Sequence, residues 1–453
     1  MWRAVLERFE QHAPVSVMAR LALDEALPAG WVDEVFEQHR QRQYARELLF
    51  STVVDLMTLV ALGLRPSLHA AARAMPELPV SLASLYDKVS HTEPAILEAL
   101  VRGSAERLAP VVAAVGGEAS LPGWRLRILD GNHLPASEKR LAPLRGHRGA
   151  ALPGQTLVVY DPDSGLVTDI VACEDAHASE RAAVPPLLDR VQPDQLWIAD
   201  RHFCTSAILQ GWDQAGARFI VREHARHPRL IKSGPWQARG RTETGAVREQ
   251  AITVDQASAP WRRIEIALDT PTQAGGAVIR LWSNLPETVE AQRIAELYRR
   301  RWRIEGLFQR LESALHSEIT SLGHPRAALL GFVAAVLAHN VLALLQRCVE
   351  QAHRPASPTL EVSSYHLALQ IRSSYDGMLI ALPPEHWPSG PADPAALADQ
   401  LLRLARAIDP RQVATRKRGP KTKKPKGYVD AAVARAHVAT ARVLRKAREA
   451  TTP

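Results

Sequence analysis

The sequence predicts an α/β protein in which a mixed sheet is flanked by helices, with an all-helical region before it and a helical, basic region after it. Three observations favour this class. Apolar residues recur every three or four positions up to about residue 118, which is typical of buried helix faces. Three strand-like segments then follow one another. Beyond them, helical and strand-like segments alternate up to about residue 225.

The first region, residues 1–118, is expected to be a helical DNA-binding domain. Helical spacing is clearest in RELLFSTVVDLMTLVALG and PAILEALVRGSAERLAPVVAAV, and the segment GGEASLPG ends the region. Between the two helices, RPSLHAAARAMPELPVSLASLYDKVSHTE resembles the short helices of helix-turn-helix modules. A helical bundle with no role in nucleic-acid binding explains this pattern equally well.

The second region, residues 119–225, is expected to hold the first part of a mixed sheet. RLRILDG, QTLVVYDPDSG and LVTDIVACED predict three strands, with DPDSG as the turn between the last two. SERAAVPPLLDRV and TSAILQGWDQAG predict helices, each followed by a strand, QLWIADR and ARFIVREH. Three antiparallel strands followed by helix–strand alternation are the order found in ribonuclease-H-like folds.

The remaining chain is expected to contain three further parts. Residues 226–284 are short strand-like segments rich in Gly and Arg, which predict a β-rich insertion into the core. Residues 285–350 return to helical patterns and are expected to complete the core. Residues 351–453 predict a helical region that ends in a basic tail.

The charge of the chain favours an acidic partner. The formal net charge is +8 and the sequence pI is about 9.6. Residues 411–450 carry 13 Lys and Arg against 2 Asp and Glu, a net of +11, which leaves −3 for the other residues. The basic character therefore lies in the tail and in local clusters, as expected for phosphate contacts that do not depend on DNA sequence. A solubilising extension is the alternative interpretation of the tail.

Several classes of protein are disfavoured. The three cysteines show neither a disulfide framework nor zinc-ligand spacing, and the N-terminus lacks the apolar run of a signal peptide, so a cytoplasmic protein is expected. Residues 327–345 are apolar and long enough to span a bilayer. His339 and Asn340 interrupt them, which favours a buried core helix and no membrane contact.

Three carboxylates are candidate site residues. Asp130 closes the strand RLRILDG and Asp200 closes LWIAD, and the ends of neighbouring strands in such sheets converge on one edge. Glu305 looks buried within ELYRRRWRIEGLFQRLES, where Arg299, Arg300, Arg301 and Arg303 surround it in the sequence.

The segment around Glu305 is expected to be one helix over residues 289–313. Tyr298, Glu305 and Glu312 then share a face with Arg301, because seven residues make about two turns. Such a helix could present a metal-binding carboxylate on one face and cations for DNA phosphates on another. A solvated face with ion pairs inside the helix is the alternative.

The motifs LDGNHL, WIADRHFCT and SNLP, followed by YRRRWRIEGLFQRLE, together resemble the DDE transposases of bacterial insertion sequences. The resemblance covers roughly residues 45 to 350 and is closest to the group with a Tyr-x2-Arg-x3-Glu-x6-Lys signature (insertion sequence type four). Tyr298, Arg301 and Glu305 match that signature, but Glu312 stands where the signature has Lys.

The resemblance implies a catalytic site and its substrate. Asp130, Asp200 and Glu305 would be the catalytic metal ligands for two Mg²⁺ ions about 3.5–4 Å apart, with Mn²⁺ as a substitute. The implied substrate is double-stranded DNA, namely the inverted-repeat ends of the element and the target, held by a homodimer. The implied reaction is nicking at the ends, followed by attack of the freed 3′-hydroxyl.

The same resemblance and the charge pattern suggest the DNA-binding residues. Arg301 would hold a phosphate and Tyr298 would contact the backbone, while Trp302, or Trp282 before SNLP, could stack a flipped base. The remaining candidates are cations, of which the first two could replace the signature Lys: Arg303, Arg310, Lys417, Lys421, Lys423 and Lys424.

Two other functions fit the sequence less closely. A non-catalytic DNA-binding protein or a decayed transposase would bind DNA without metal-dependent cleavage. A ribonuclease-H-like nuclease would cleave DNA without joining strands.

Overall fold

The computed structural model describes residues 1–43, 47–75, 78–226, 228–255, 257, 259–272, 275–388, 390–391, 393–416 and 437–450. The tail residues proposed to bind DNA, Lys417, Lys421, Lys423 and Lys424, lie outside these ranges.

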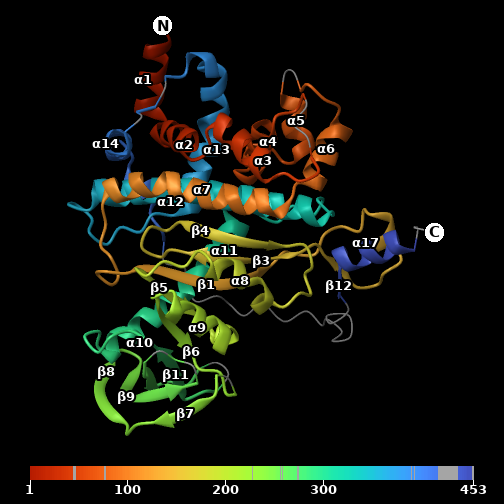
Figure 1. Cartoon of the computed structure of the whole chain (residues 1–453). Helices are drawn as coiled ribbons and strands as arrows, with labels where there is room; N and C mark the ends of the chain where they lie inside the picture. Colours follow the sequence, from red (N-terminus) through yellow and green to blue (C-terminus); the bar gives the residue numbers. More distant parts are fainter. Residues whose placement is uncertain are drawn as a thin grey trace.

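Helices form the first region of the chain, as its apolar spacing predicts (Figure 1). Ser67 and Ser81 cap two of them, because each hydroxyl accepts a hydrogen bond from a free N–H group of the first turn. The helices are α1 (Trp2–His12), α2 (Pro14–Ala26), α3 (Ala29–His39), α4 (Phe50–Ala61), α5 (Leu68–Ala74), α6 (Leu82–His91) and α7 (Pro94–Val115).

The core sheet has the strand order β4-β3-β1-β5-β6. β3 pairs antiparallel with both β1 and β4, whereas β5 pairs parallel with both β1 and β6. This mixed sheet is consistent with the ribonuclease-H-like order that the sequence predicts. The strands are β1 (Arg125–His133), β3 (Gln155–Tyr160), β4 (Val167–Cys173), β5 (Gln195–Ala199) and β6 (Arg218–Arg222).

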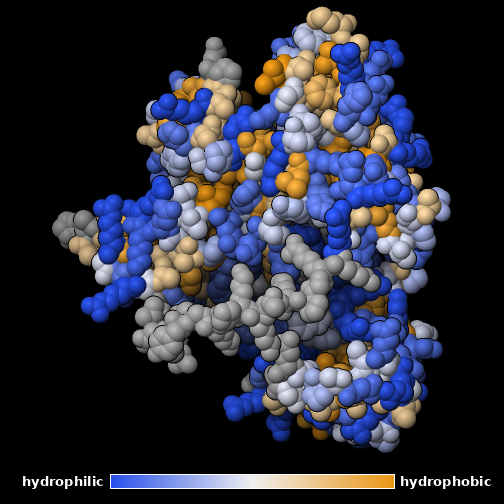
Figure 2. Space-filling model, turned by 180° about the vertical axis from the view of Figure 1, so that it is seen from behind, coloured by the Kyte–Doolittle hydropathy of each residue, from blue (hydrophilic) through white to orange (hydrophobic). Residues whose placement is uncertain are grey.

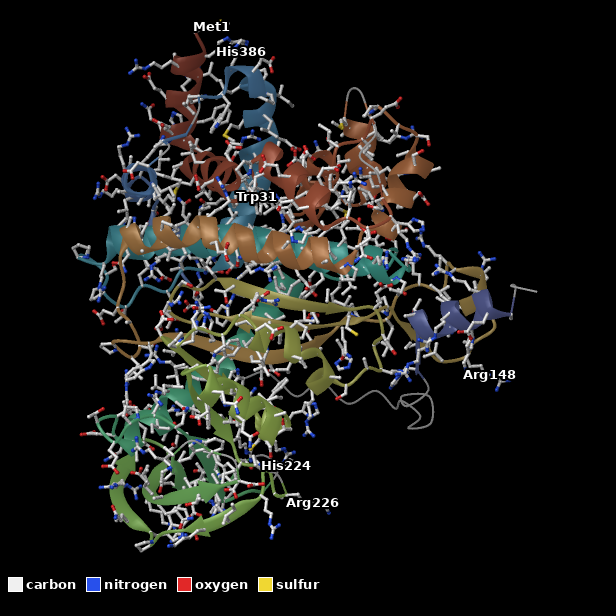
Figure 3. The ribbon with its side chains drawn as sticks, viewed as in Figure 1. Met1, Trp31, Arg148, His224, Arg226 and His386 are labelled. Carbon is white, nitrogen blue, oxygen red and sulfur yellow. The ribbon has the colours of Figure 1, made fainter. Side chains whose placement is uncertain are left out.

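The β-rich segment continues this sheet. Its last strand pairs with β6, and the order then runs β11-β10-β9, where β9 also pairs with β7 and β8. In Figure 1 these strands form the lower part of the molecule, and Figure 3 shows His224 and Arg226 where the chain leaves β6 for them. The strands are β7 (Leu230–Ser233), β8 (Gln237–Thr242), β9 (Gly245–Val254), β10 (Trp261–Leu268) and β11 (Val278–Ser283).

Both faces of the core sheet are covered. Alternate residues such as Leu126 and Ile128 pack under α7 and α12 (Pro325–His353), while Leu129 and Trp197 pack against α8 (Pro185–Leu188) and α9 (Ser206–Gln214). Figure 1 shows the other N-terminal helices lying above the layer of α7 and α12.

The other elements are short connections between the strands and the helices that follow the β-rich segment. The remaining elements are η1 (Ala142–Leu144), β2 (Ala150–Leu152), η2 (Glu180–Ala183), η3 (Arg201–Phe203), α10 (Ala291–Arg299), η4 (Arg300–Trp302), α11 (Arg303–Ser313), α13 (Ser364–Ala381), η5 (Pro384–His386), α14 (Pro394–Arg406), α15 (Pro410–Val413), β12 (His437–Ala439) and α17 (Thr440–Glu449).

The expectation of one helix over 289–313 is wrong. The chain forms α10, a 3-10 turn at η4, and then α11. Tighter winding over Arg300–Trp302 shifts the faces of the two helices, so sequence spacing does not place Tyr298, Glu305 and Glu312 in one line. Tyr298 is buried, whereas Glu312 is exposed.

The C-terminal end of the chain returns to the core. β12 pairs in parallel with β2, and Arg442 of α17 forms an ion pair with Asp175. His177 Nε2 and His437 Nδ1 are 2.8 Å apart. The residues at 437–449 are therefore docked on the protein and are not a free extension.

The apolar helix α12 is a core helix, as the sequence predicts. Its length and composition would suit a membrane span, but all of its apolar stretch is buried in the protein. On the face shown in Figure 2, hydrophobic residues are scattered among hydrophilic ones. α12 thus contributes its apolar side chains to the contact between the sheet and the helical region.

Two polar residues of α12 hold the hairpin between β3 and β4. Asn340 is fully buried, and its side-chain amide accepts from Val167 N at 2.8 Å and donates to Val167 O at 2.9 Å. Burial lowers the pKa of His339 to about 3, so its neutral ring donates from Nε2 to Gly165 O at 3.1 Å. The two polar residues that interrupt the apolar helix therefore form hydrogen bonds with backbone groups at the edge of the sheet.

A mid-helix glycine lets α3 approach α7 closely. A Cβ on Gly103 would lie 2.3 Å from the ring of Trp31, which Figure 3 labels above α7. Glycine costs helix stability in itself, so here it serves the contact with the tryptophan ring.

We expect Asn340→Leu to lower the free energy of unfolding by about 3 kcal/mol, because it leaves two buried backbone groups without partners. Urea denaturation followed by circular dichroism measures the loss. Gln346→Leu on the same helix removes a single bond to Val362 O and should cost about 1 kcal/mol. Equal losses in the two variants would contradict this role for Asn340.

Candidate active site

The register of β1 and β5 places two acids side by side. Leu129 lies opposite Ala199 in the parallel pair, so Asp130 and Asp200 are the next residues on neighbouring strands. Both continue the alternation of Leu126, Ile128, Leu196 and Ile198, and they therefore lie on the face of the sheet that α11 approaches. Asp200 also caps η3, since its Oδ1 accepts from His202 N at 2.7 Å.

The segment η4–α11 brings the third acid to this edge through an arginine. Arg301 Nη1 lies 3.1 Å from Asp130 Oδ2, and its Nη2 lies 3.3 Å from Glu305 Oε1. The side chain of Glu305 is 44% exposed, so the expectation that it is buried is wrong. Arg301 itself is 11% exposed and lies 4.7 Å from the ring centroid of Trp302.

The ionisable groups of the site are perturbed mainly by burial. Burial raises the pKa of Asp130 to about 6, with a further rise from Asp200 and Glu180 and an opposing effect of Arg301. Burial also raises the pKa of Tyr298 to about 12, against the positive charges of Arg301 and Arg222. These two residues thus favour their neutral forms more than ordinary side chains do.

The neighbouring arginines contact other parts of the protein. Arg299 pairs with Glu243 in the turn between β8 and β9, and Arg300 pairs with Asp163 and contacts Ser120. Arg303 donates to Pro162 O at 3.0 Å. Arg310 lies beside the buried hydroxyl of Tyr160. Only Arg301, of the arginines in 299–303, contacts the candidate acids among the described residues.

The two tryptophans of the sequence prediction have different surroundings. Trp282 is 2% exposed and packs in the hydrophobic core with Trp261. Trp302 is 59% exposed beside Arg301. Stacking of a base is therefore sterically open at Trp302 and blocked by packing at Trp282.

Sequence reasoning missed the acid Glu180. It lies at the same edge, with Oε2 3.5 Å from His202 Nε2 and Oε1 4.0 Å from His133 Nδ1. A Cβ on Gly131 would lie 2.1 Å from Glu180 Oε1. Because this glycine is in an extended strand, its small size serves the approach of Glu180. In the sequence, the glycine directly after Asp130 was the signal that another group approaches this strand closely.

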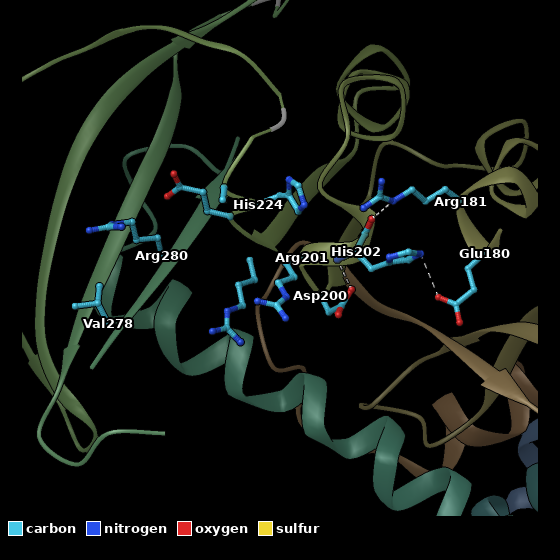
Figure 4. Close-up of a pocket in the computed structure, with 11 residues that line it drawn as sticks. Glu180, Arg181, Asp200, Arg201, His202, His224, Val278 and Arg280 are labelled. Carbon is cyan, nitrogen blue, oxygen red and sulfur yellow. Dashed lines mark hydrogen bonds and ion pairs between the residues drawn. The ribbon is translucent and has the colours of Figure 1, made fainter. Parts of the chain in front are cut away.

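A cavity of about 690 Å³ adjoins Asp200. Residues of the core and of the β-rich segment line opposite sides of it; in Figure 4, Glu180 and His202 lie on one side and Arg280 on the other. Arg201 and Arg222 also line it, and neither is ion-paired within the described part of the chain. These cations suit an anionic ligand and were likewise missed from the sequence.

The described residues do not form a ready-made metal cluster. Within the described ranges, no three His, Cys, Asp or Glu side chains are grouped closely enough to hold a metal ion. Carboxylate oxygens are nevertheless the ligands that hard divalent cations prefer, and Asp200 has no Lys or Arg partner in the same ranges. Asp130, Asp200 and Glu305 are candidate ligands by their chemistry, but in this arrangement they are not grouped closely enough to hold a cation together, and Arg301 contacts two of them.

The chain is similar to known transposases. Residues 123–341 match a protein family described as "Transposase DDE domain". The chain is also similar to "Putative transposase InsL for insertion sequence element IS186A" of Escherichia coli (strain K12), at 27% identity over 334 residues, which cover 63% of this chain and 83% of the relative. The "Transposase for insertion sequence element IS421" of Escherichia coli is 27% identical over 336 residues, with the same coverage.

The raised pKa of Asp130 predicts a pH-dependent effect of its removal. Its contribution to stability is greatest below the ordinary pKa of Asp and is lost as the pH rises through about 6. Wild type should therefore lose about 2 kcal/mol of unfolding free energy between pH 4.5 and 7.5 that Asp130→Asn, which cannot titrate there, does not lose. The stability of the variant relative to wild type rises by the same amount. Urea unfolding at both pH values measures the difference, and a constant difference would contradict the raised pKa.

The contact between Gly131 and Glu180 predicts a non-additive pair of substitutions. Gly131→Ala should lower stability by about 0.5–1 kcal/mol, because the new methyl group displaces the flexible carboxylate from His202. The loss should disappear in the Glu180→Ala background. Gly146→Ala is the control, since a Cβ there meets nothing within 4 Å. An equal loss from Gly131→Ala in both backgrounds would rule out this contact as the cause.

Proposed function

Since the chain is a DDE-type transposase of the kind that insertion sequences encode, we propose that it cuts the ends of its element and joins them to target DNA. The single observation that carries this proposal is the adjacency of Asp130 and Asp200 at one sheet edge, with Glu305 connected to Asp130 through Arg301. Asp130, Asp200 and Glu305 are the proposed catalytic residues.

A divalent cation, Mg²⁺ with Mn²⁺ as a substitute, is the proposed cofactor. Bound as a pair of ions, it would activate the attacking oxygen and stabilise the leaving oxygen at the scissile phosphate. The donor set supports it, because Asp130 and Asp200 each follow a paired residue on neighbouring strands, and Arg301 contacts Asp130. Asp130 and Asp200 would be its ligands from the sheet, and Glu305 its ligand from α11.

The protein's own groups would hold the DNA near these acids. Arg301 can donate to a phosphate through its two Nη groups, and the exposed ring of Trp302 beside it can stack on a base. Tyr298 is buried, so we propose that it supports Arg301. Only its hydroxyl group would contact the DNA backbone. Arg201 and Arg222 would bind phosphates in the cavity beside Asp200.

The other cations are weaker candidates for DNA contacts. Arg303 and Arg310 remain proposed phosphate ligands, although each already contacts a group of the protein. Glu312, in place of the signature Lys, is exposed at the end of α11. The Tyr-Arg-Glu-Lys group is thus a proposed assignment that rests on Tyr298, Arg301 and Glu305.

The arrangement of the chain suggests how two DNA ends would be held. We assign residues 1–118 to DNA binding, with α5 and α6 as the helix pair that resembles a helix-turn-helix module. Residues 119–225 and 285–350 would form the catalytic core, 226–284 its insertion, and 351–453 a C-terminal region with a basic tail. Two inverted-repeat ends have to be joined to one target, so we propose that a homodimer holds the DNA. We also propose that the protein acts in the cytoplasm.

We expect Asp130→Ala, Asp200→Ala and Glu305→Ala each to lower Mg²⁺-dependent cleavage of a duplex with the element's end by roughly 100-fold or more, because each removes a negative charge that holds the cation. DNA binding, measured by fluorescence anisotropy, should be retained. Glu312→Ala is the matched control, as an exposed acid of the same helix.

Products on a denaturing gel separate the possible functions. Joined strands are expected for a transposase, whereas cleavage without joining would indicate a nuclease. Binding without any cleavage by wild type would indicate a non-catalytic protein. Undiminished cleavage by one of the alanine variants would remove that residue from the site.

A further inference from the structure

We infer that Arg301 and the catalytic cation compete for the same carboxylate oxygens, so that binding of the cation is coupled to binding of DNA. This inference rests on the proposed function and concerns the regulation of the same site. It makes the free protein a weak cation binder and the DNA complex a strong one.

Arg301 occupies carboxylate oxygens that the cation would need. Its guanidinium lies between Asp130 Oδ2, at 3.1 Å, and Glu305 Oε1, at 3.3 Å. These are two of the three acids that would hold the cation. The guanidinium keeps its charge at all physiological pH values, so it cannot make room by losing a proton. Two positive groups cannot share these oxygens, and one of them has to move away.

Two features of Arg301 favour a second position for its guanidinium, bound to DNA. Its Nε is buried without a hydrogen-bond partner, so the described contacts leave part of its donor capacity unused. Its planar group lies against the ring of Trp302, which is exposed to solvent. A phosphate bound near Trp302 would give the guanidinium a partner that it can bind through two parallel hydrogen bonds.

The neighbouring arginines cannot play the same part. Arg299, Arg300 and Arg303 contact Glu243, Asp163 and Pro162 O, respectively. Arg301 thus neutralises Asp130 and Glu305 in the free protein, and it leaves them when it binds a DNA phosphate. By thermodynamic reciprocity, the factor by which DNA tightens cation binding equals the factor by which the cation tightens DNA binding.

The experiment measures binding of Mn²⁺ from the signal of free Mn²⁺ in electron paramagnetic resonance. Wild type is titrated alone and with a duplex that ends at the already cleaved 3′ end, so that no cleavage step intervenes. Asp130→Ala with the same duplex gives the Mn²⁺ that DNA itself binds, which is subtracted. We expect DNA to lower the Kd for Mn²⁺ by about five-fold or more, the lower end of ordinary coupling.

The decisive variant is Arg301→Gln. Without DNA it should bind Mn²⁺ about five-fold or more tightly than wild type, and DNA should add little further affinity. Arg300→Gln is the matched control, because Arg300 is adjacent in the chain but pairs with Asp163. It should retain the wild-type coupling.

Two results would overturn the inference. The first is unchanged or weaker Mn²⁺ binding by Arg301→Gln, which would mean that Arg301 only positions the acids. The second needs no variant: a wild-type affinity for DNA, from fluorescence anisotropy, that is the same with and without Mn²⁺. Wild type that binds no Mn²⁺ even on DNA would instead refute the proposed metal site, so the two failures are distinguishable.

Discussion

The parallel pairing of β1 with β5 is the constraint on which the rest of the site depends. Its register makes Asp130 and Asp200 neighbours at the end of the sheet, on the face that α11 approaches. Other segments reach the same edge from different directions: α11 carries Glu305, and η2 carries Glu180 against Gly131. The proposed metal chemistry rests on this edge, because carboxylate oxygens are the ligands that hard divalent cations prefer.

Several negative charges in a partly buried site lower the stability of the fold. Of the arginines in residues 299–303, only Arg301 contacts these acids among the described residues. Arg301 balances Asp130 and Glu305, yet the pKa of Asp130 stays near 6 because burial outweighs this one cation. The arginines beside it hold the β8–β9 turn and the β3–β4 turn to the same segment. One short run of the chain therefore joins the sheet edge that carries the two acids, the β-rich segment and the β3–β4 hairpin.

The hydrophobic core has its own polar requirement. α12 is apolar because it is covered on all sides, but the hairpin that packs on it carries backbone groups that no strand of the described residues pairs with beyond β4. Asn340 and His339 supply those hydrogen bonds. Two polar residues in an apolar helix are thus a consequence of where the sheet ends, and they hold the start of β4 and the turn before it.

The sequence by itself determined the periodic elements, the burial of α12, and the two acids at strand ends, because hydrophobic period and strand ends are local properties of the chain. The resemblance in YRRRWRIEGLFQRLE added Glu305. Only the tertiary structure decided that the helix breaks at η4, that Trp302 is exposed while Trp282 is buried, and that residues 437–439 pair with β2. It also revealed Glu180 and the partners of each arginine. These features depend on contacts between segments far apart in the chain, which local patterns do not encode.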